Sequence, residues 1–77
     1  MELQDFVAKM AKQFNETDIN EFQASTEFKD LSEYGSMTEQ AIIVMIDAEY
    51  SVVVKWDDVR KAETVEDLFN IVKRYKS

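Results

Sequence analysis

The residues of this sequence that could do chemistry are its carboxylates and hydroxyls, because its 77 residues include neither histidine nor cysteine. The usual catalytic triads and thiol nucleophiles are therefore excluded, and so are the usual ligands of a zinc site. The acidic pairs Asp57-Asp58 and Glu66-Asp67 are typical of solvated helix starts rather than of an acid/base pair. We expect neither enzymatic activity nor a metal site in this chain.

Two loop motifs that bind ligands do not fit the sequence. Asp18-Ile19-Asn20 begins like a calcium-binding loop, but Phe22 occupies the next ligand position and the required glycine is missing. A loop that cradles phosphate groups needs several glycines, whereas Gly35 is the only glycine in the chain. Neither calcium binding nor nucleotide binding is indicated by these motifs.

One hydroxyl, that of Ser36, has a position with chemical meaning. Ser36 stands at the head of a predicted helix, and Glu39 follows three residues later, which is the pattern of a capping box. The Ser36 oxygen can cap the backbone N–H of residue 38 or 39. Alternatively, the hydroxyl can carry a phosphate, which the exposed N–H groups and positive dipole end of a helix stabilise. The tripeptide Gly35-Ser36-Met37 by itself favours the cap.

The helix headed by Ser36 is one of four that apolar spacing predicts. The central helix runs to Tyr50, and although its stretch from Ile42 to Ile46 could form a strand, its length and cap favour a buried helix. A short helix covers 56–61, and Thr64 caps the last one. An apolar stripe marks the first helix, which stops near Asn15, and it consists of Leu3, Phe6, Val7, Met10, Ala11 and Phe14. A second apolar stripe marks the last helix, and it consists of Val65, Leu68, Phe69, Val72 and Tyr75.

The segments between these helices are predicted to be irregular but anchored. Residues 15–35 form a long loop that apolar side chains pin to the core, namely Ile19, Phe22, Phe28 and Leu31, with a short helical turn at Phe28–Leu31. Residues 51–55 form an extended connector that buries Val52 and Val54. The sequence thus predicts an all-α four-helix bundle, a single domain over residues 1–77, with a long first loop and a short third helix.

Charge and hydropathy restrict the partners. Sixteen acidic residues against nine basic ones give a net charge of −7, which repels nucleic acid and anionic membranes and favours basic protein surfaces. The longest apolar run, Ala41–Ile46, is too short for a membrane span, and the start at Met1 has no signal-peptide pattern. Lack of cysteine fits the reducing cytosol. We expect a cytoplasmic monomer without membrane insertion.

The order of these features resembles that of the acyl carrier proteins. Members of that family place an Asp-Ser-Leu motif at the start of the second helix of a four-helix bundle, and this chain has Gly35-Ser36-Met37 there. An aromatic residue, here Tyr50, ends that helix. A valine-rich link, an acidic third helix starting near Asp57-Asp58 and a Thr64-Val65 pair follow. The pattern covers Gly35 to the C-terminus and extends more loosely to the first helix and the long loop.

The resemblance implies that Ser36 carries a 4′-phosphopantetheine arm, added from coenzyme A by a separate phosphopantetheinyl transferase. The arm would hold acyl intermediates as thioesters and deliver them to enzymes of fatty-acid, polyketide or related specialised synthesis. The resemblance also implies an acidic face to which basic docking patches of these acyl-processing enzymes bind. Its expected residues are Met37, for which a core position is an equal alternative, and Glu39, Asp47, Glu49, Asp57 and Asp58.

Three positions depart from the family pattern. Gly35 replaces the aspartate of the motif, which removes an acidic group that the transferase would meet and loosens the backbone. Ser32 replaces a glycine in the loop, and Lys55 replaces a proline. These differences indicate a divergent carrier. The alternative is an unmodified carrier-like module for protein interaction, which Gly35 motivates.

Overall fold

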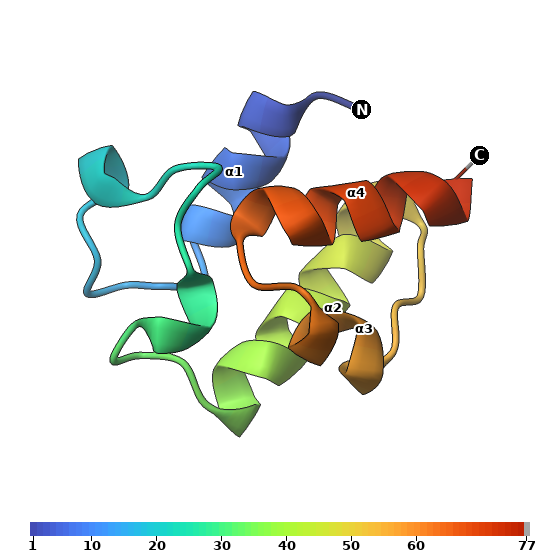
Figure 1. Cartoon of the computed structure of the whole chain (residues 1–77). Helices are drawn as coiled ribbons and strands as arrows, with labels where there is room; N and C mark the ends of the chain where they lie inside the picture. Colours follow the sequence, from blue (N-terminus) through green and yellow to red (C-terminus); the bar gives the residue numbers. More distant parts are fainter. Residues whose placement is uncertain (77) are drawn as a thin grey trace.

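The chain folds into four α-helices joined by a long loop and two shorter links, and the structure, a computed structural model, describes residues 1–76 (Figure 1). No strand occurs within this range. The all-helical prediction is therefore confirmed, and the strand alternative for Ile42–Ile46 is wrong. The elements are, in order, α1 (Leu3–Ala11), the 3-10 turns η1 (Ile19–Glu21) and η2 (Phe28–Asp30), α2 (Ser36–Tyr50), α3 (Trp56–Lys61) and α4 (Val65–Lys76).

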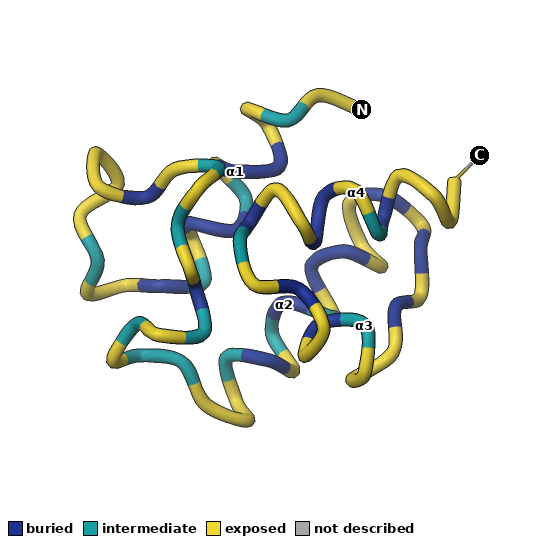
Figure 2. Tube along the Cα trace, in the orientation of Figure 1, coloured by how far each residue is buried: buried dark blue, intermediate teal, exposed yellow. Residues whose placement is uncertain are grey.

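The core lies where the helices meet. α1 and α3 both pack against α4, and α3 also packs against α2. The Phe6 ring of α1 joins two other helices, with its centroid 5.6 Å from that of Phe69 and 5.8 Å from that of Tyr50. Burial of these apolar side chains supplies the main stabilisation in a chain without disulfides (Figure 2). The largest fully buried residues are Phe6, Met10, Phe14, Phe28, Ile42, Ile46, Val59, Val65, Leu68 and Val72.

α1 ends earlier than its apolar stripe predicts. Its last residue is Ala11, and the chain continues through turns in which the N–H groups of Gln13 and Phe14 bond to the carbonyl oxygens of Met10 and Ala11. Phe14 nevertheless stays buried, because the tighter turns keep it on the side of the core. The stripe therefore identified the buried residues correctly but overestimated the length of the helix.

Aromatic side chains anchor the long loop, which lies to one side of α2, α3 and α4 in Figure 1. The rings of Phe14 and Phe22 have their centroids 5.2 Å apart, and Phe28 is fully buried beside Tyr34. The predicted helical turn at Phe28 is confirmed by η2. Ile19, in contrast, is 64% exposed, so its predicted role as an anchor is wrong. It lies in η1, on the outside of the loop.

The loop also caps the last helix. The backbone N–H groups of Val65 and Glu66 donate to the carbonyl oxygens of Thr26 and Ala24, at 3.1 and 2.9 Å. The Thr64 hydroxyl accepts from the N–H of Asp67 at 3.1 Å, which confirms the predicted cap. These bonds satisfy N–H donors that the start of a helix leaves without intrahelical partners.

The connector between α2 and α3 is extended, as predicted. Val52 and Val54 are buried, while Val53 between them is exposed, which is the alternation of an extended chain. Ser51 ends α2 in the left-handed region, with φ of 57°. No helix among residues 1–76 is long and apolar enough to cross a membrane.

Candidate modification site at the start of α2

Ser36 is the first residue of the central helix and is exposed to solvent. The N–H of Glu39 donates to the carbonyl oxygen of Gly35 at 2.9 Å, so Gly35, and not Ser36, is the N-cap residue. The predicted capping box between Ser36 and Glu39 is therefore wrong. The helix begins one residue earlier than that pattern requires, and the Glu39 side chain has other partners.

Gly35 leaves open space beside the serine. Its backbone is extended, with φ and ψ both at −172°, and a Cβ atom built there would meet no atom within 4 Å. Glycine also has no side chain to accept from the first N–H groups of α2. Those groups and the positive end of the helix dipole lie next to the Ser36 hydroxyl. The exposure of Ser36 leaves its hydroxyl accessible, and the adjacent helix end favours the negative charge of a phosphodiester there.

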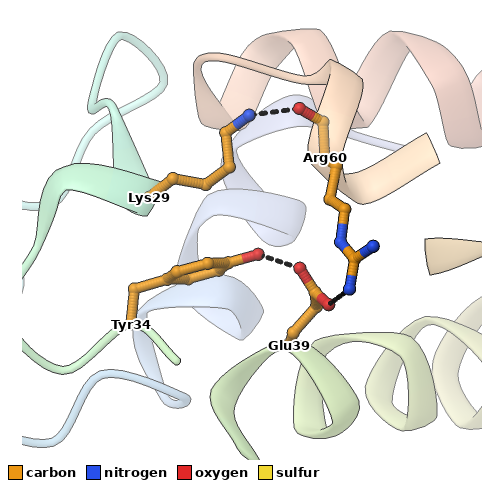
Figure 3. A network of polar contacts seen from close by, with 4 residues as sticks. All are labelled: Lys29, Tyr34, Glu39 and Arg60. Atoms are coloured by element: carbon orange, nitrogen blue, oxygen red, sulfur yellow. Dashed lines mark hydrogen bonds and ion pairs between the residues drawn. The ribbon is translucent and has the colours of Figure 1, made fainter. Parts of the chain in front are cut away.

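Glu39 does not contribute to an exposed acidic face, and that prediction is wrong. Only 4% of the residue is exposed. One carboxylate oxygen, Oε2, accepts a hydrogen bond from the Tyr34 hydroxyl, and the other, Oε1, lies 3.3 Å from Arg60 Nη2 (Figure 3). The loop before α2 and helix α3 thus meet this side chain from two directions, which explains why it is buried.

Further bonds hold the loop that leads to Ser36. The Thr38 hydroxyl donates to the carbonyl oxygen of Glu33 at 2.6 Å. The Glu33 carboxylate accepts from the Thr17 hydroxyl at 2.7 Å and from the N–H of Glu16 at 3.1 Å. The hydrogen bond from Thr17 is the main cause that lowers the pKa of Glu33 below its usual value. The loop is therefore tied both to α2 and to itself.

Four of the other predicted contact residues lie on the surface. Met37 is 86% exposed, which excludes its alternative role in the core. Asp47, Glu49 and Asp57 are exposed as well, although Glu49 forms an ion pair with Lys9 at 3.4 Å. The ion pair with Lys9 therefore reduces the negative charge that Glu49 offers to a partner.

Asp58 is half-buried and has a structural role. It accepts hydrogen bonds from the N–H of Lys55 at 3.0 Å and from the Tyr75 hydroxyl. Partial desolvation acts to raise the pKa of Asp58, but these bonds and nearby lysine charges outweigh it and lower the pKa below its usual value. Asp58 therefore stabilises the start of α3 and its contact with α4.

Four residues of this region were not predicted from the sequence. Gln40 and Val44 share the exposed face of α2 with Met37 and Asp47, at spacings of three and four residues, and Val44 is 54% exposed. Helical periodicity could have identified this face, but Val44 lies within an apolar run that reads as buried. No pattern in the sequence identified Tyr34 and Arg60 as the partners of Glu39.

Comparison of the chain with protein-family models, with curated proteins and with solved structures finds no match. A functional proposal therefore depends on the chemistry and geometry around Ser36 and on the sequence pattern from Gly35 onward. The exposed serine, the open space at Gly35 and the adjacent helix terminus together suit covalent attachment of a phosphate-linked group.

Proposed function

We propose that this protein is an acyl carrier protein that holds acyl intermediates as thioesters on a 4′-phosphopantetheine arm attached to Ser36. It delivers them to partner enzymes of fatty-acid, polyketide or related specialised synthesis. The observation that carries the proposal is the exposed serine at the first residue of the central helix. The proposal is also supported by the four-helix order of the chain, since the sequence pattern from Gly35 onward resembles that of acyl carrier proteins, which are four-helix bundles.

Ser36 is the residue that changes covalently in this proposal. A phosphopantetheinyl transferase brings coenzyme A to it, and the Ser36 oxygen forms the new bond to phosphorus. The hydroxyl proton passes to a base of the transferase, and adenosine 3′,5′-bisphosphate leaves. The N–H groups and dipole of α2 then stabilise the negative phosphodiester. The attached arm supplies the thiol that this chain, which has no cysteine, lacks.

The exposed face of α2 is the docking surface in this proposal. Met37 and Val44 supply apolar contact area, and Asp47 supplies negative charge one helical turn beyond Val44. A basic patch on the partner enzyme complements this face and the chain's net charge of −7. Such charges mainly set the rate and selectivity of encounter.

One observation favours a second candidate, an unmodified carrier-like module for protein interaction. Gly35 stands where the family motif has an aspartate, so an acidic group that the transferase would meet is missing. In that case the same face of α2 binds a partner protein, and the Ser36 hydroxyl has no covalent role. Ser36→Ala would then leave partner binding unchanged.

The two candidates are separated by a loading reaction. The folded protein is incubated with coenzyme A and a broad-specificity phosphopantetheinyl transferase, and Ser36→Ala and Ser32→Ala are treated in parallel. A carrier loses loading in Ser36→Ala and keeps it in Ser32→Ala, which changes an exposed serine of the preceding loop. Absence of loading in the wild-type protein with more than one transferase would favour the interaction module.

A further inference from the structure

Glu39 is the only charged side chain that is buried among the residues that the structure describes. A buried carboxylate is costly unless charges and hydrogen bonds compensate it, and apolar residues of similar size often replace such groups without loss of stability. The compensation here comes from one neutral donor, Tyr34, and one cation, Arg60. These two partners come from the two segments that flank the start of α2 (Figure 3).

Tyr34 is a suitable permanent donor. Its ring packs edge-on against buried Phe28, with centroids 5.9 Å apart, so the hydroxyl is directed by the core. Burial, with the hydrogen bond to Glu39, raises the pKa of Tyr34 well above its usual value. The phenol therefore stays protonated and keeps donating throughout the neutral range.

Arg60 is itself held from two sides. Its guanidinium carbon lies 5.9 Å from the centre of the Trp56 ring, a cation–π distance, and its carbonyl oxygen accepts from Lys29 Nζ (Figure 3). Lys29 belongs to η2 in the long loop. Loop, α2 and α3 are thus joined by one polar cluster, which we call the Glu39 cluster: Lys29, Tyr34, Glu39 and Arg60.

The Glu39 cluster spans the segment that contains Gly35 and Ser36. Tyr34 and Glu39 lie on either side of Gly35 and Ser36, and Gly35 has no side chain and no neighbour within 4 Å of its Cβ position. Packing therefore does not fix this glycine, and glycine is the residue with the greatest backbone freedom. The bond from Tyr34 to Glu39 and that from Thr38 to Glu33 add restraint to the backbone hydrogen bond that the Gly35 carbonyl oxygen accepts from the N–H of Glu39 at 2.9 Å.

We propose that Glu39 is a positioning residue for Ser36, which it holds through Tyr34 and Arg60 in the orientation that the transferase meets. This inference rests on the proposed function of Ser36 as the attachment site. The restraint keeps the serine oxygen within a narrow range of positions before the transferase binds. Loss of the restraint should act on the turnover of the loading reaction, since small misplacements of a reacting atom reduce rates strongly.

The kinetic test compares two matched substitutions, each of which removes a tyrosine hydroxyl that donates a hydrogen bond to a carboxylate. Tyr34→Phe breaks the Glu39 cluster and keeps the ring, whereas Tyr75→Phe removes the bond to Asp58, outside the Glu39 cluster. Tyr34→Phe should lower kcat for loading by about tenfold or more and leave KM for the carrier within about twofold. Tyr75→Phe should leave both constants unchanged. If Tyr34→Phe instead weakened docking of the carrier to the transferase, KM for the carrier would rise, which would contradict the positioning role.

A second readout needs no transferase. Backbone ¹⁵N order parameters of Gly35, Ser36 and Met37 in the unmodified wild-type protein should lie near the rigid value of about 0.85, and fall toward about 0.6 in Tyr34→Phe. Residues of the second half of α2 should not change. Unchanged order parameters in Tyr34→Phe would overturn the positioning role, whatever the loading rate. Failure of wild-type loading would overturn the proposed function instead, and the order parameters would still decide the role of Glu39.

Discussion

The Tyr34 hydroxyl donates a hydrogen bond to the Glu39 carboxylate, and these two residues flank Gly35 and Ser36 in the chain. This side-chain bond joins the two ends of segment 34–39, which contains the serine. Arg60 Nη2 completes the arrangement from α3, 3.3 Å from the second oxygen of Glu39. The start of α2 is therefore stabilised by partly buried polar contacts, although its N-cap residue is a glycine.

Removal of the cation from this arrangement should destabilise the fold. We expect Arg60→Gln to lower the free energy of unfolding by about 1 kcal/mol, since Glu39 stays buried with one donor fewer while Arg60 itself is largely solvated. Urea denaturation measures the change. The control is Lys61→Gln, an exposed neighbour on the same helix. An equal loss of stability in both variants would show that the ion pair with Glu39 has no special role.

Replacing Gly35 by the aspartate that acyl carrier proteins have before their serine should improve both the helix and the loading reaction. Gly35→Asp places a side chain in open space at the N-cap of α2, where aspartate is favoured over glycine by a few tenths of a kcal/mol. The added charge should raise kcat/KM for the transferase up to about fivefold, which corresponds to one exposed ion pair.

Gly35→Asn is the matched control, since it caps the helix as well as aspartate does and carries no charge. Comparison of the two variants separates the effect of the cap from that of the charge. If Gly35→Asn increased loading as much as Gly35→Asp, recognition of an acidic group by the transferase would be excluded as the cause.

The loop before Ser36 should weaken in acid. The hydrogen bond from Thr17 holds the pKa of Glu33 below its usual value, so the folded state favours the ionised carboxylate. This contribution is present above the usual carboxylate pKa of about 4.3 and is lost as the pH falls through the lower pKa of the folded protein. Wild-type protein should therefore lose more stability than Glu33→Gln between about pH 5 and pH 3.

Thermal unfolding over this pH range measures the difference. Glu27→Gln is the control, since Glu27 is exposed in the same loop and its side chain does not cap η2. Parallel pH profiles for wild type and Glu33→Gln would contradict the role of Glu33.

Residues on the exposed face of α2 should determine how the transferase docks, and a substitution there should not affect the fold. Val44→Arg adds a cation at a position that is 54% exposed, where it would repel a basic partner surface. We expect KM for the transferase to rise at least about fivefold, with the unfolding curve unchanged. Ile19→Arg is the control, because Ile19 is similarly exposed and belongs to η1 of the long loop, a turn that lies away from α2 in Figure 1. Equal effects of the two variants would exclude a specific docking face.

Local patterns predicted the helices well. The Thr64 cap, the alternation at Val52–Val54 and the last stripe from Val65 to Val72 depend on neighbours in sequence and agree with the structure. Tyr75, the last residue of the predicted stripe, is 47% exposed, so the prediction was wrong there. The extent of α1 was overestimated because Phe14 remains in the core after the helix has ended. Periodicity reports which side chains are buried and not whether the backbone between them is helical.

The environment of Glu39 could not be predicted in the same way. Its burial depends on Arg60, which is 21 residues away, and on Tyr34 in an irregular loop. A glutamate three residues after a serine is the usual sign of a capping box, so local sequence indicated the wrong partner. The structure places the N-cap at Gly35, one residue before the predicted Ser36, and leaves Ser36 exposed.

The central claim, that Ser36 is a phosphopantetheine attachment site, is tested most directly by the intact mass of the protein. Folded wild-type protein and Ser36→Ala are incubated with coenzyme A and a broad-specificity phosphopantetheinyl transferase, and both masses are recorded before and after. Attachment at Ser36 gives the wild-type protein a gain of one phosphopantetheine unit and gives Ser36→Ala none. An unchanged wild-type mass with several transferases, or an equal gain in Ser36→Ala, would contradict it.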